Sequence, residues 1–413
     1  MRQRRYTRNQ SQPFTATSDR VIPLGDGLAA IPERLLLAHA RGEVLFIAGA
    51  GVSKPAGLPD FRKLVLDVYA QLDSAVHLVI DKIPHDAHNQ WQPNLSGLNH
   101  QQCAEVRRFV RKDFDVVLGM LERRMDDVPH ARSRVRTAIA NELRKKGVKP
   151  APIHRALMQL ADRGGALTIA TTNFDFLLEE TSRKSNPKVQ SYAHGGIPRP
   201  SRKEDFAGVL HIHGSLAPDP ARISDLIVTD RDFGEYYLRR RVVPDFIYDA
   251  ARLFNIVLVG YSANDPPMRY LLNAVAADGT RFDDLKERFA FVAWDSEPDH
   301  VELQDWYGRG ITPIPYSDAK SHAALCRTLE RWAILSAHNV NKVRIDAVFK
   351  RIVRNSRKSV NDSERDLVDH LARRADNNER VRLAKLASQS GADMEWLDAI
   401  MSIINENSTE PHQ

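Results

Sequence analysis

Short, continuous runs of apolar residues alternate along the chain with longer segments of helical periodicity. The apolar runs predict strands, alone or at the start of a strand-loop-helix unit, at Val44–Ala48, Ala166–Glu180, Val209–Ser215, Asn255–Leu272, Phe289–Trp294 and Ile311–Tyr316. Helices are expected at Ile31–Gly42, at Leu64–Ile80 and through Arg107–Lys146. Fully apolar strands separated by helices are typical of a parallel sheet covered on both faces. The pattern therefore predicts an α/β fold with a Rossmann-like, doubly wound parallel sheet.

The two ends of the chain lack this alternation. Residues 1–25 form an arginine-rich polar tail that we expect to be flexible, and residues 321–413 indicate a charged helical segment. The α/β domain is thus expected at 26–320, with a helical insertion at about 64–150. In the C-terminal segment, an apolar stripe with the spacing i, i+3, i+4 and i+7 consists of Ile345, Val348, Phe349 and Ile352. This stripe either builds an assembly with other chains or packs on the chain's own core.

Composition narrows the class of protein. The chain has 413 residues, a net charge of +6 and only two cysteines, Cys103 and Cys326, which exclude a disulfide framework and a four-cysteine zinc site. We find no signal peptide and no apolar run of the roughly 20 residues that a membrane helix needs, so we expect a cytoplasmic protein without membrane contact. The positive charge permits nucleic-acid binding, but arginine clusters in the tail and at 107–112 are also typical of a solvated surface.

The strand Val44–Ala48 runs into the turn Gly49-Ala50-Gly51, which carries the first sign of chemistry. Closely spaced glycines let backbone amides approach a phosphate, and Ser53 can add a hydroxyl group. The turn departs from the dinucleotide-binding fingerprint G-x-G-x-x-G, because Lys54 stands where the third glycine would be. Taken alone, the glycine pair is equally well explained by a tight turn.

Four motifs in chain order give the sequence a specific resemblance. They are Gly49–Ser53 followed by Gly57-Leu-Pro-Asp-Phe-Arg62, then Thr172-Asn-Phe-Asp175, His213-Gly214 and Gly260-Tyr-Ser262. Together they closely resemble the sirtuin signatures G-A-G-x-S with G-I-P-D-F-R, Q-N-x-D with threonine for glutamine, the catalytic histidine-glycine pair, and the late G-x-S. The later motifs are especially similar to the SIR2-like family of bacterial antiphage defence systems. The resemblance covers roughly residues 41–295 and implies a sirtuin-type sheet that binds NAD.

The resemblance implies NAD+ as the substrate and cleavage of the bond between nicotinamide and ribose. Asn173 is expected to position a water molecule through its amide. His213, a residue type that titrates near neutral pH, is expected to act as the base. His211 lies two residues earlier and would face the same way on a strand, and we expect it behind the site. The implied activity is that of an NAD+ glycohydrolase that forms nicotinamide and ADP-ribose.

The resemblance also implies a set of residues that bind NAD. Phe61 is expected over the nicotinamide, Arg62 near the ribose and phosphates, and Asp175 at the carboxamide. For Asp60 and Asp175, capping of a helix is the alternative role. The full set is Ala48, Gly49, Ala50, Gly51, Ser53, Asp60, Phe61, Arg62, Asp175, Gly260 and Ser262.

One departure from the sirtuin pattern concerns zinc. Deacetylating sirtuins carry four zinc-binding cysteines after the catalytic histidine, whereas only Cys326 follows His213 here. Deacetylation is therefore in doubt, water is the expected acceptor, and we expect no metal. A different set of possible zinc ligands consists of His85, His88, His100 and Cys103, although such a spacing also arises by chance.

An enzyme that consumes NAD+ is toxic to its host unless it is held inactive. We therefore expect control by a homo-oligomer or by a second protein. SIR2-like proteins of this compact form resemble those paired with a HerA-like ATPase, which makes such an ATPase the expected partner. The alternatives are a regulatory subunit that senses NAD or ADP-ribose, a DNA-associated component whose binding would weaken with salt, and a divergent protein deacylase.

Overall fold

The computed structural model describes residues 20–85, 91–127, 132–145, 147–163, 166–182, 189–193, 196–202, 205–216, 220–261, 285–295, 300–339 and 342–403. Within these ranges the strands are β1 (Val21–Pro23), β2 (Ala30–Pro32), β3 (Val44–Ala48), β4 (Thr168–Thr171), β5 (Ser191–Tyr192), β6 (Gly208–His211), β7 (Asn255–Val259), β8 (Arg288–Trp294) and β9 (Thr312–Ser317). The helices of the first half are α1 (Glu33–Ala40), α2 (Phe61–Leu72), α3 (Ser74–Ile80), α4 (His100–Val110), α5 (Phe114–Met125), α6 (Arg134–Leu143), α7 (Pro152–Leu160) and α8 (Leu177–Thr181). Those of the second half are α9 (Asp230–Phe233), α10 (Val242–Leu253), α12 (His300–Gly308), α13 (Ala319–Leu335), α14 (Val343–Val353), α15 (Asp362–Arg373), α16 (Asn377–Gln389) and α17 (Met394–Ser402).

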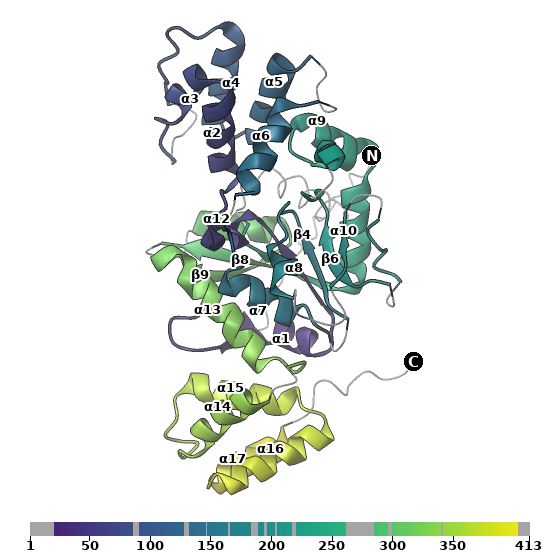
Figure 1. Cartoon of the computed structure of the whole chain (residues 1–413). Helices are drawn as coiled ribbons and strands as arrows, with labels where there is room; N and C mark the ends of the chain where they lie inside the picture. The colour runs from purple at the N-terminus through teal and green to yellow at the C-terminus, as the bar shows by residue number, and fades with distance from the viewer. Residues whose placement is uncertain are drawn as a thin grey trace, which may run out of the picture.

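A parallel sheet lies at the centre of the molecule (Figure 1). Among the described residues it has seven strands in the order β5-β6-β4-β3-β7-β8-β9, and all neighbours are parallel. The chain first fills the side of β3 that holds β4, β5 and β6, and then crosses to place β7 on the other side. Ligands of such sheets bind at the carboxyl ends of the strands, where the order reverses. The predicted doubly wound α/β fold is confirmed.

Alternate residues of each strand face two separate cores, because successive side chains point to opposite faces of a sheet. In β3, Phe46 and Ala48 belong to the core shared with α1, α7 and α13. Leu45 and Ile47 belong to the core shared with α10 and α12. All five residues of β3 are buried, which is why an uninterrupted apolar run predicts its bounds so well.

Helices α2 to α6 form the helical insertion at one end of the sheet (Figure 1). They pack around a third apolar core, which includes Val65 and Leu118 of the insertion and also Leu226 and Val228 from outside it. The helix expected over Leu64–Ile80 is in fact two helices. Asp73 leaves the helical region with φ at −150°, and its carboxylate accepts a hydrogen bond from Val76 N to cap α3.

Helices α14 to α17 lie at the opposite end of the sheet (Figure 1). Ile345, Phe349 and Ile352 of the apolar stripe are buried, and Val348 packs against the same core. That core is continuous with the sheet face covered by α1, α7 and α13. Of the two roles considered for the stripe, packing on the chain's own core is the one that the structure shows.

The N-terminal boundary differs from the sequence pattern, which places residues 1–25 in a flexible tail. Val21–Pro23 forms β1, antiparallel to β2, and burial of Ile22 and Ile31 in the main core stabilises this hairpin. The helix expected from Ile31 begins at Glu33, because Pro32 ends β2 and is the N-cap residue. Residues 1–19 lie outside the described part. No helix in the described part is long and apolar enough to cross a membrane.

Candidate active site

A pocket lies at the carboxyl ends of β3, β4 and β6, beside the point where the strand order reverses. Its space, including the part open to solvent, is about 730 Å³. Its polar lining consists of Ser53, Asp60, Thr172, Asn173, Asp175, His213 and Tyr261. Its apolar lining consists of Ala50, Leu58, Pro59, Phe61, Leu64, Leu143, Phe174, Ile227 and Phe233. Segments far apart in the sequence thus meet in one pocket.

The glycine turn after β3 lies tightly against the loop after β7. Gly49 N donates to Val259 O at 2.8 Å, and Gly51 N donates to Gly260 O at 3.0 Å. A Cβ atom at Gly49 would lie 2.6 Å from the Tyr261 ring, and one at Gly51 would lie 2.9 Å from Gly260 Cα. Contact between the two loops therefore requires both glycines. Their amides are engaged within the protein, which differs from the open phosphate cradle that the sequence pattern predicts.

Asn173 lies at the centre of the polar lining. Its Nδ2 atom donates to Gly49 O and to Ser53 Oγ, both at 3.0 Å, and Ser53 Oγ donates to Asp175 Oδ2 at 2.9 Å. Because both amide hydrogens of Asn173 are used, its Oδ1 atom is the one left to accept a hydrogen bond. Burial raises the pKa of the Asp175 carboxyl above its usual range, although hydrogen bonds from Leu177 N and Ser53 act in the opposite direction.

The main chain of Asn173 is fixed from two sides. Its N–H donates to Thr171 Oγ1 at 3.0 Å. Its carbonyl oxygen lies 2.9 Å from His211 Nδ1, while His211 Nε2 lies 2.8 Å from Glu179 Oε1. His211 is fully buried and is absent from the pocket lining, so it lies behind Asn173.

His213 forms another part of the pocket wall. Its Nε2 atom lies 2.6 Å from Tyr237 OH, and its ring meets the rings of Phe233 and Tyr237 edge-on. Burial raises the pKa of Tyr237 well above its usual value, so the phenol keeps its proton. Because β6 ends at His211, His213 lies in the following turn, and the expectation that both histidines share one strand face is wrong.

The second half of the domain matches a known family. Residues 167–314 match the family model described as a SIR2-like domain. This stretch resembles a SIR2-like domain. It contains Asn173, Asp175 and His213, whereas the glycine turn at 49–51 precedes it. The match supports a sirtuin-related chain.

One relative of this chain is an uncharacterized protein, y4cA, of Sinorhizobium fredii. It is 34% identical over a match of 291 residues that covers 68% of this chain and 22% of y4cA, so the chain spans less than a quarter of that relative. Two solved structures, of a Sir2 enzyme and of a Sir2 homologue with NAD, are 16% identical to this chain. They cover 73% and 75% of this chain and 96% and 95% of their own, with TM-scores of 0.32 and 0.31. Likeness at this level adds nothing to the fold described above.

The structure brings several of the implied NAD-binding residues to the pocket. Asp60 lines the pocket and also caps α2, because its carboxylate accepts a hydrogen bond from Lys63 N. Asp175 accepts from Leu177 N, the first residue of α8, but Phe176 is the N-cap residue of that helix, so the alternative capping role is shown for Asp60 alone. The other implied residues in the lining are Ala50, Ser53 and Phe61. Ala48, Gly49, Gly51 and Gly260 form the strand end and turns around it, and Ser262 lies outside the described residues.

Arg62 lies outside the pocket lining. Its Nη2 atom donates to Ile83 O at 2.6 Å, and its guanidinium lies 5.3 Å from the centre of the Phe109 ring. A carbonyl and an aromatic face of the helical insertion therefore hold this side chain, and it is absent from the pocket lining.

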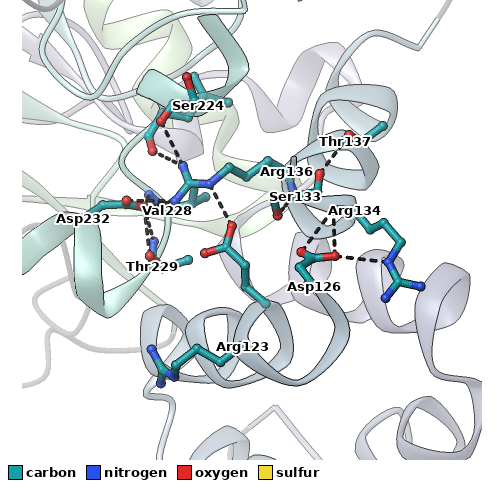
Figure 2. Close-up of polar contacts among 12 residues, drawn as sticks. Arg123, Asp126, Ser133, Arg134, Arg136, Thr137, Ser224, Val228, Thr229 and Asp232 are labelled. Carbon is teal, nitrogen blue, oxygen red and sulfur yellow. Dashed lines mark hydrogen bonds and ion pairs between the residues drawn. The ribbon is translucent and has the colours of Figure 1, made fainter. Parts of the chain in front are cut away.

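The apolar wall of the pocket joins two regions, since Leu143 comes from α6 and Phe233 from α9. A buried ion network ties these helices together (Figure 2). Arg136 Nη2 on α6 lies 2.8 and 2.7 Å from the two carboxylate oxygens of Asp232 on α9. Arg136 Nε lies 2.9 Å from Glu122 Oε1 on α5. The network thus fixes the insertion against the wall that contains Phe233.

The described ranges hold no group of metal ligands, and three residues that the sequence does not predict support the pocket. Within the described ranges, no three His, Cys, Asp or Glu side chains are placed to hold a metal ion, and His88 of the proposed four-residue pattern lies outside them. Sequence reasoning misses Glu179, Tyr237 and Tyr261. Tyr261 OH donates to Ala48 O at 3.0 Å and anchors the loop after β7. Tyr237 lies 24 positions after His213, and no local pattern links the two.

Proposed function

We propose that this pocket binds NAD+ and that the chain is an NAD+ glycohydrolase. The N-glycosidic bond breaks and its electron pair leaves with nicotinamide, while a water oxygen bonds to the ribose carbon and a proton is released. The products are nicotinamide and ADP-ribose. The observation that carries the proposal is that Asn173 and His213, at the ends of the paired strands β4 and β6, line one pocket beside the aromatic ring of Phe61.

The roles follow from the chemistry of the side chains. The free Oδ1 of Asn173 can accept a hydrogen bond from the attacking water, and His213 can take the proton that this water loses. The apolar side of the pocket, which includes Phe61 and Phe233, suits a flat nicotinamide ring and keeps bulk water away from the reacting carbon. Asp175 can hydrogen-bond the carboxamide from the polar side.

The direct test is product formation by the purified full chain. We expect nicotinamide and ADP-ribose in equal amounts by chromatography. His213→Ala and Asn173→Ala are each expected to lower kcat by about 10²-fold or more, because each removes a group that acts on the water. His300→Ala and Asn378→Ala, at exposed positions away from the pocket, serve as matched controls. Full activity in both site variants would sink the proposal.

The same assay separates the alternatives. Binding of NAD+ by calorimetry, with no product in the wild type, would favour a sensor of NAD or ADP-ribose. Nicotinamide release that depends on an acetyl-lysine peptide would favour a deacylase, with the acyl group as acceptor in place of water.

We further propose that NAD+ depletion by this chain serves antiphage defence, restrained by a homo-oligomer or a HerA-like ATPase. The support is the resemblance of the later motifs to SIR2-like defence proteins. Cells that express the wild type should lose NAD+ on phage infection, and cells that express His213→Ala should keep it. Equal NAD+ levels in the two strains would contradict the defence role without bearing on the activity of the purified chain.

A further inference from the structure

One buried titratable group near the pocket has no part in the reaction proposed above. His211 ends β6, and its side chain is 0% exposed. It lies between the Asn173 main chain on one side and Glu179 of α8 on the other. The Phe176 ring covers it at a centroid distance of 5.3 Å.

The two hydrogen bonds of His211 define where its protons are. A carbonyl oxygen can only accept, so Nδ1, at 2.9 Å from Asn173 O, must carry a hydrogen. Nε2 faces Glu179 Oε1 at 2.8 Å, and that oxygen also accepts from Ser191 Oγ at 2.8 Å. A proton between an imidazole and a carboxyl resides on the imidazole, whose ordinary pKa is higher by about two units. Both ring nitrogens of His211 are therefore protonated.

We propose that His211 is a buried imidazolium, paired with Glu179, that positions the catalytic Asn173 through its main-chain carbonyl. The clamp joins β6, the loop after β4 and α8, so it sets the peptide plane from which the Asn173 amide reaches the pocket. The pair is neutral overall, so it adds no net charge beside the cationic ribose centre of the reaction. This role rests on the proposed function, but the charge state of His211 does not.

The electrostatics agree with this geometry. Burial alone would lower the pKa of His211, but the hydrogen bond and the charge of Glu179 outweigh burial and raise the pKa above its ordinary value. Asp175 acts in the same direction. The stabilising contribution of the clamp is thus complete below pH 6.5, the ordinary histidine value, and is lost as the pH rises through the raised pKa in the folded state.

Nitrogen NMR of the histidine-labelled full chain tests the charge state without any reference to activity. The His211 signals, assigned by their absence in His211→Gln, should show the imidazolium pattern at pH 7. They should titrate above 6.5, and in Glu179→Gln they should titrate lower. A neutral ring at pH 7 in the wild type would overturn the proposal.

Kinetics of the same proteins test the positioning role. Glu179→Gln keeps the shape of the side chain and removes its charge, and we expect kcat to fall on the order of 10²-fold with KM for NAD+ nearly unchanged, because the attacking geometry is lost rather than binding. The alkaline limb of the kcat profile should move to lower pH. Glu180→Gln, on the same helix, is the control and should behave as the wild type. Unchanged kcat in a folded Glu179→Gln would overturn the role, whereas an inactive wild type would count against the proposed function alone.

Discussion

The helical insertion and the C-terminal helices are both attached to the central sheet, at opposite ends (Figure 1). The insertion, α2 to α6, forms most of a third apolar core, separate from the two sheet cores, and Leu226 and Val228 from outside the insertion complete it. The C-terminal helices, α14 to α17, have no separate core and share the one on the sheet face covered by α1, α7 and α13. One region therefore packs on the domain through a third core at their junction, and the other completes a core of the sheet itself.

The buried ion pairs that attach the two regions also differ in their distance from the pocket. Arg136 joins the insertion to Asp232, next to Phe233 in the pocket wall. Glu33 of α1 joins the C-terminal helices through His370 at 3.0 Å and Arg373 at 2.7 Å, and none of these three residues lines the pocket. Similar buried ion pairs thus serve the site in one region and the scaffold in the other.

Removal of the C-terminal helices should have the largest effect. A chain that ends at His338 lacks α14, which contacts α13, and α15, which contacts β1. Each fully buried apolar side chain left uncovered costs about 1.5–3 kcal/mol, so a few of them equal the whole stability of a typical domain. We expect an insoluble protein, or one without a cooperative unfolding transition by calorimetry. A soluble, folded chain of lower mass by light scattering would contradict the core role and restore the assembly role for this segment.

The two regions also differ in how far the sequence anticipates them. The spacing of Ile345, Phe349 and Ile352 predicts an apolar helix face, because that signal lies within one helix. The spacing does not say what covers the face. Nothing distinguishes Arg136 from Arg134 in the sequence, and only the fold brings the former to Asp232, 96 positions later.

For the site, too, the sequence predicts local elements better than contacts between distant residues. Asn173 and His213 follow apolar strands that end at one edge of a parallel sheet, so strand pattern and motif together predict that they lie near each other. Arg62 could not be placed in this way, because its partner is the carbonyl of Ile83, a group that every residue offers. A contact to a main-chain atom cannot be predicted from the residue types in the sequence.

Loss of the insertion's ion network should have the next largest effect. Arg136→Met leaves Glu122 and Asp232 buried without their cation, and we expect unfolding free energy to fall by about 5 kcal/mol, with loss of NAD+ turnover. Arg123→Met is the matched control, since the Arg123–Asp230 pair also joins α5 to α9 but is partly exposed, and its loss should cost less than about 1 kcal/mol. Urea denaturation and product assays give both values. Equal stability of the two variants would refute the distinction between buried and exposed pairs.

The scaffold pair should affect stability without affecting turnover. Glu33→Gln leaves Arg373 partly uncompensated, and we expect a loss of about 3 kcal/mol, with kcat and KM of the folded protein unchanged. Burial raises the pKa of Glu33, but hydrogen bonds from His370 and Arg373 outweigh it and lower the pKa to about 2. The wild type should therefore lose this stability as the pH falls from about 4.5 toward 2, and the variant should show a shallower acid dependence.

Glu43→Gln is the control for that comparison, because its pair with Arg41 is partly exposed. Its stability should stay within about 1 kcal/mol of the wild type. A fall in kcat of folded Glu33→Gln, with Glu43→Gln unaffected, would show that the C-terminal attachment reaches the pocket after all.

The smallest expected effect compares one leucine from each region. Leu143 of α6 is half-buried against the core of the insertion and lines the pocket, while Leu386 of α16 is half-buried against the core of the sheet face and lies far from it. Substitution by alanine removes similar apolar contact at both sites, so we expect each variant to lose about 1–2 kcal/mol of stability. Only Leu143→Ala also widens the pocket, and KM for NAD+ should rise by a few-fold, equivalent to about 1 kcal/mol of lost contact with the ligand. Steady-state kinetics at matched folded concentration measure the difference. A similar rise of KM in Leu386→Ala would mean that the effect reflects general loosening of the fold, and the insertion would then have no special part in the site.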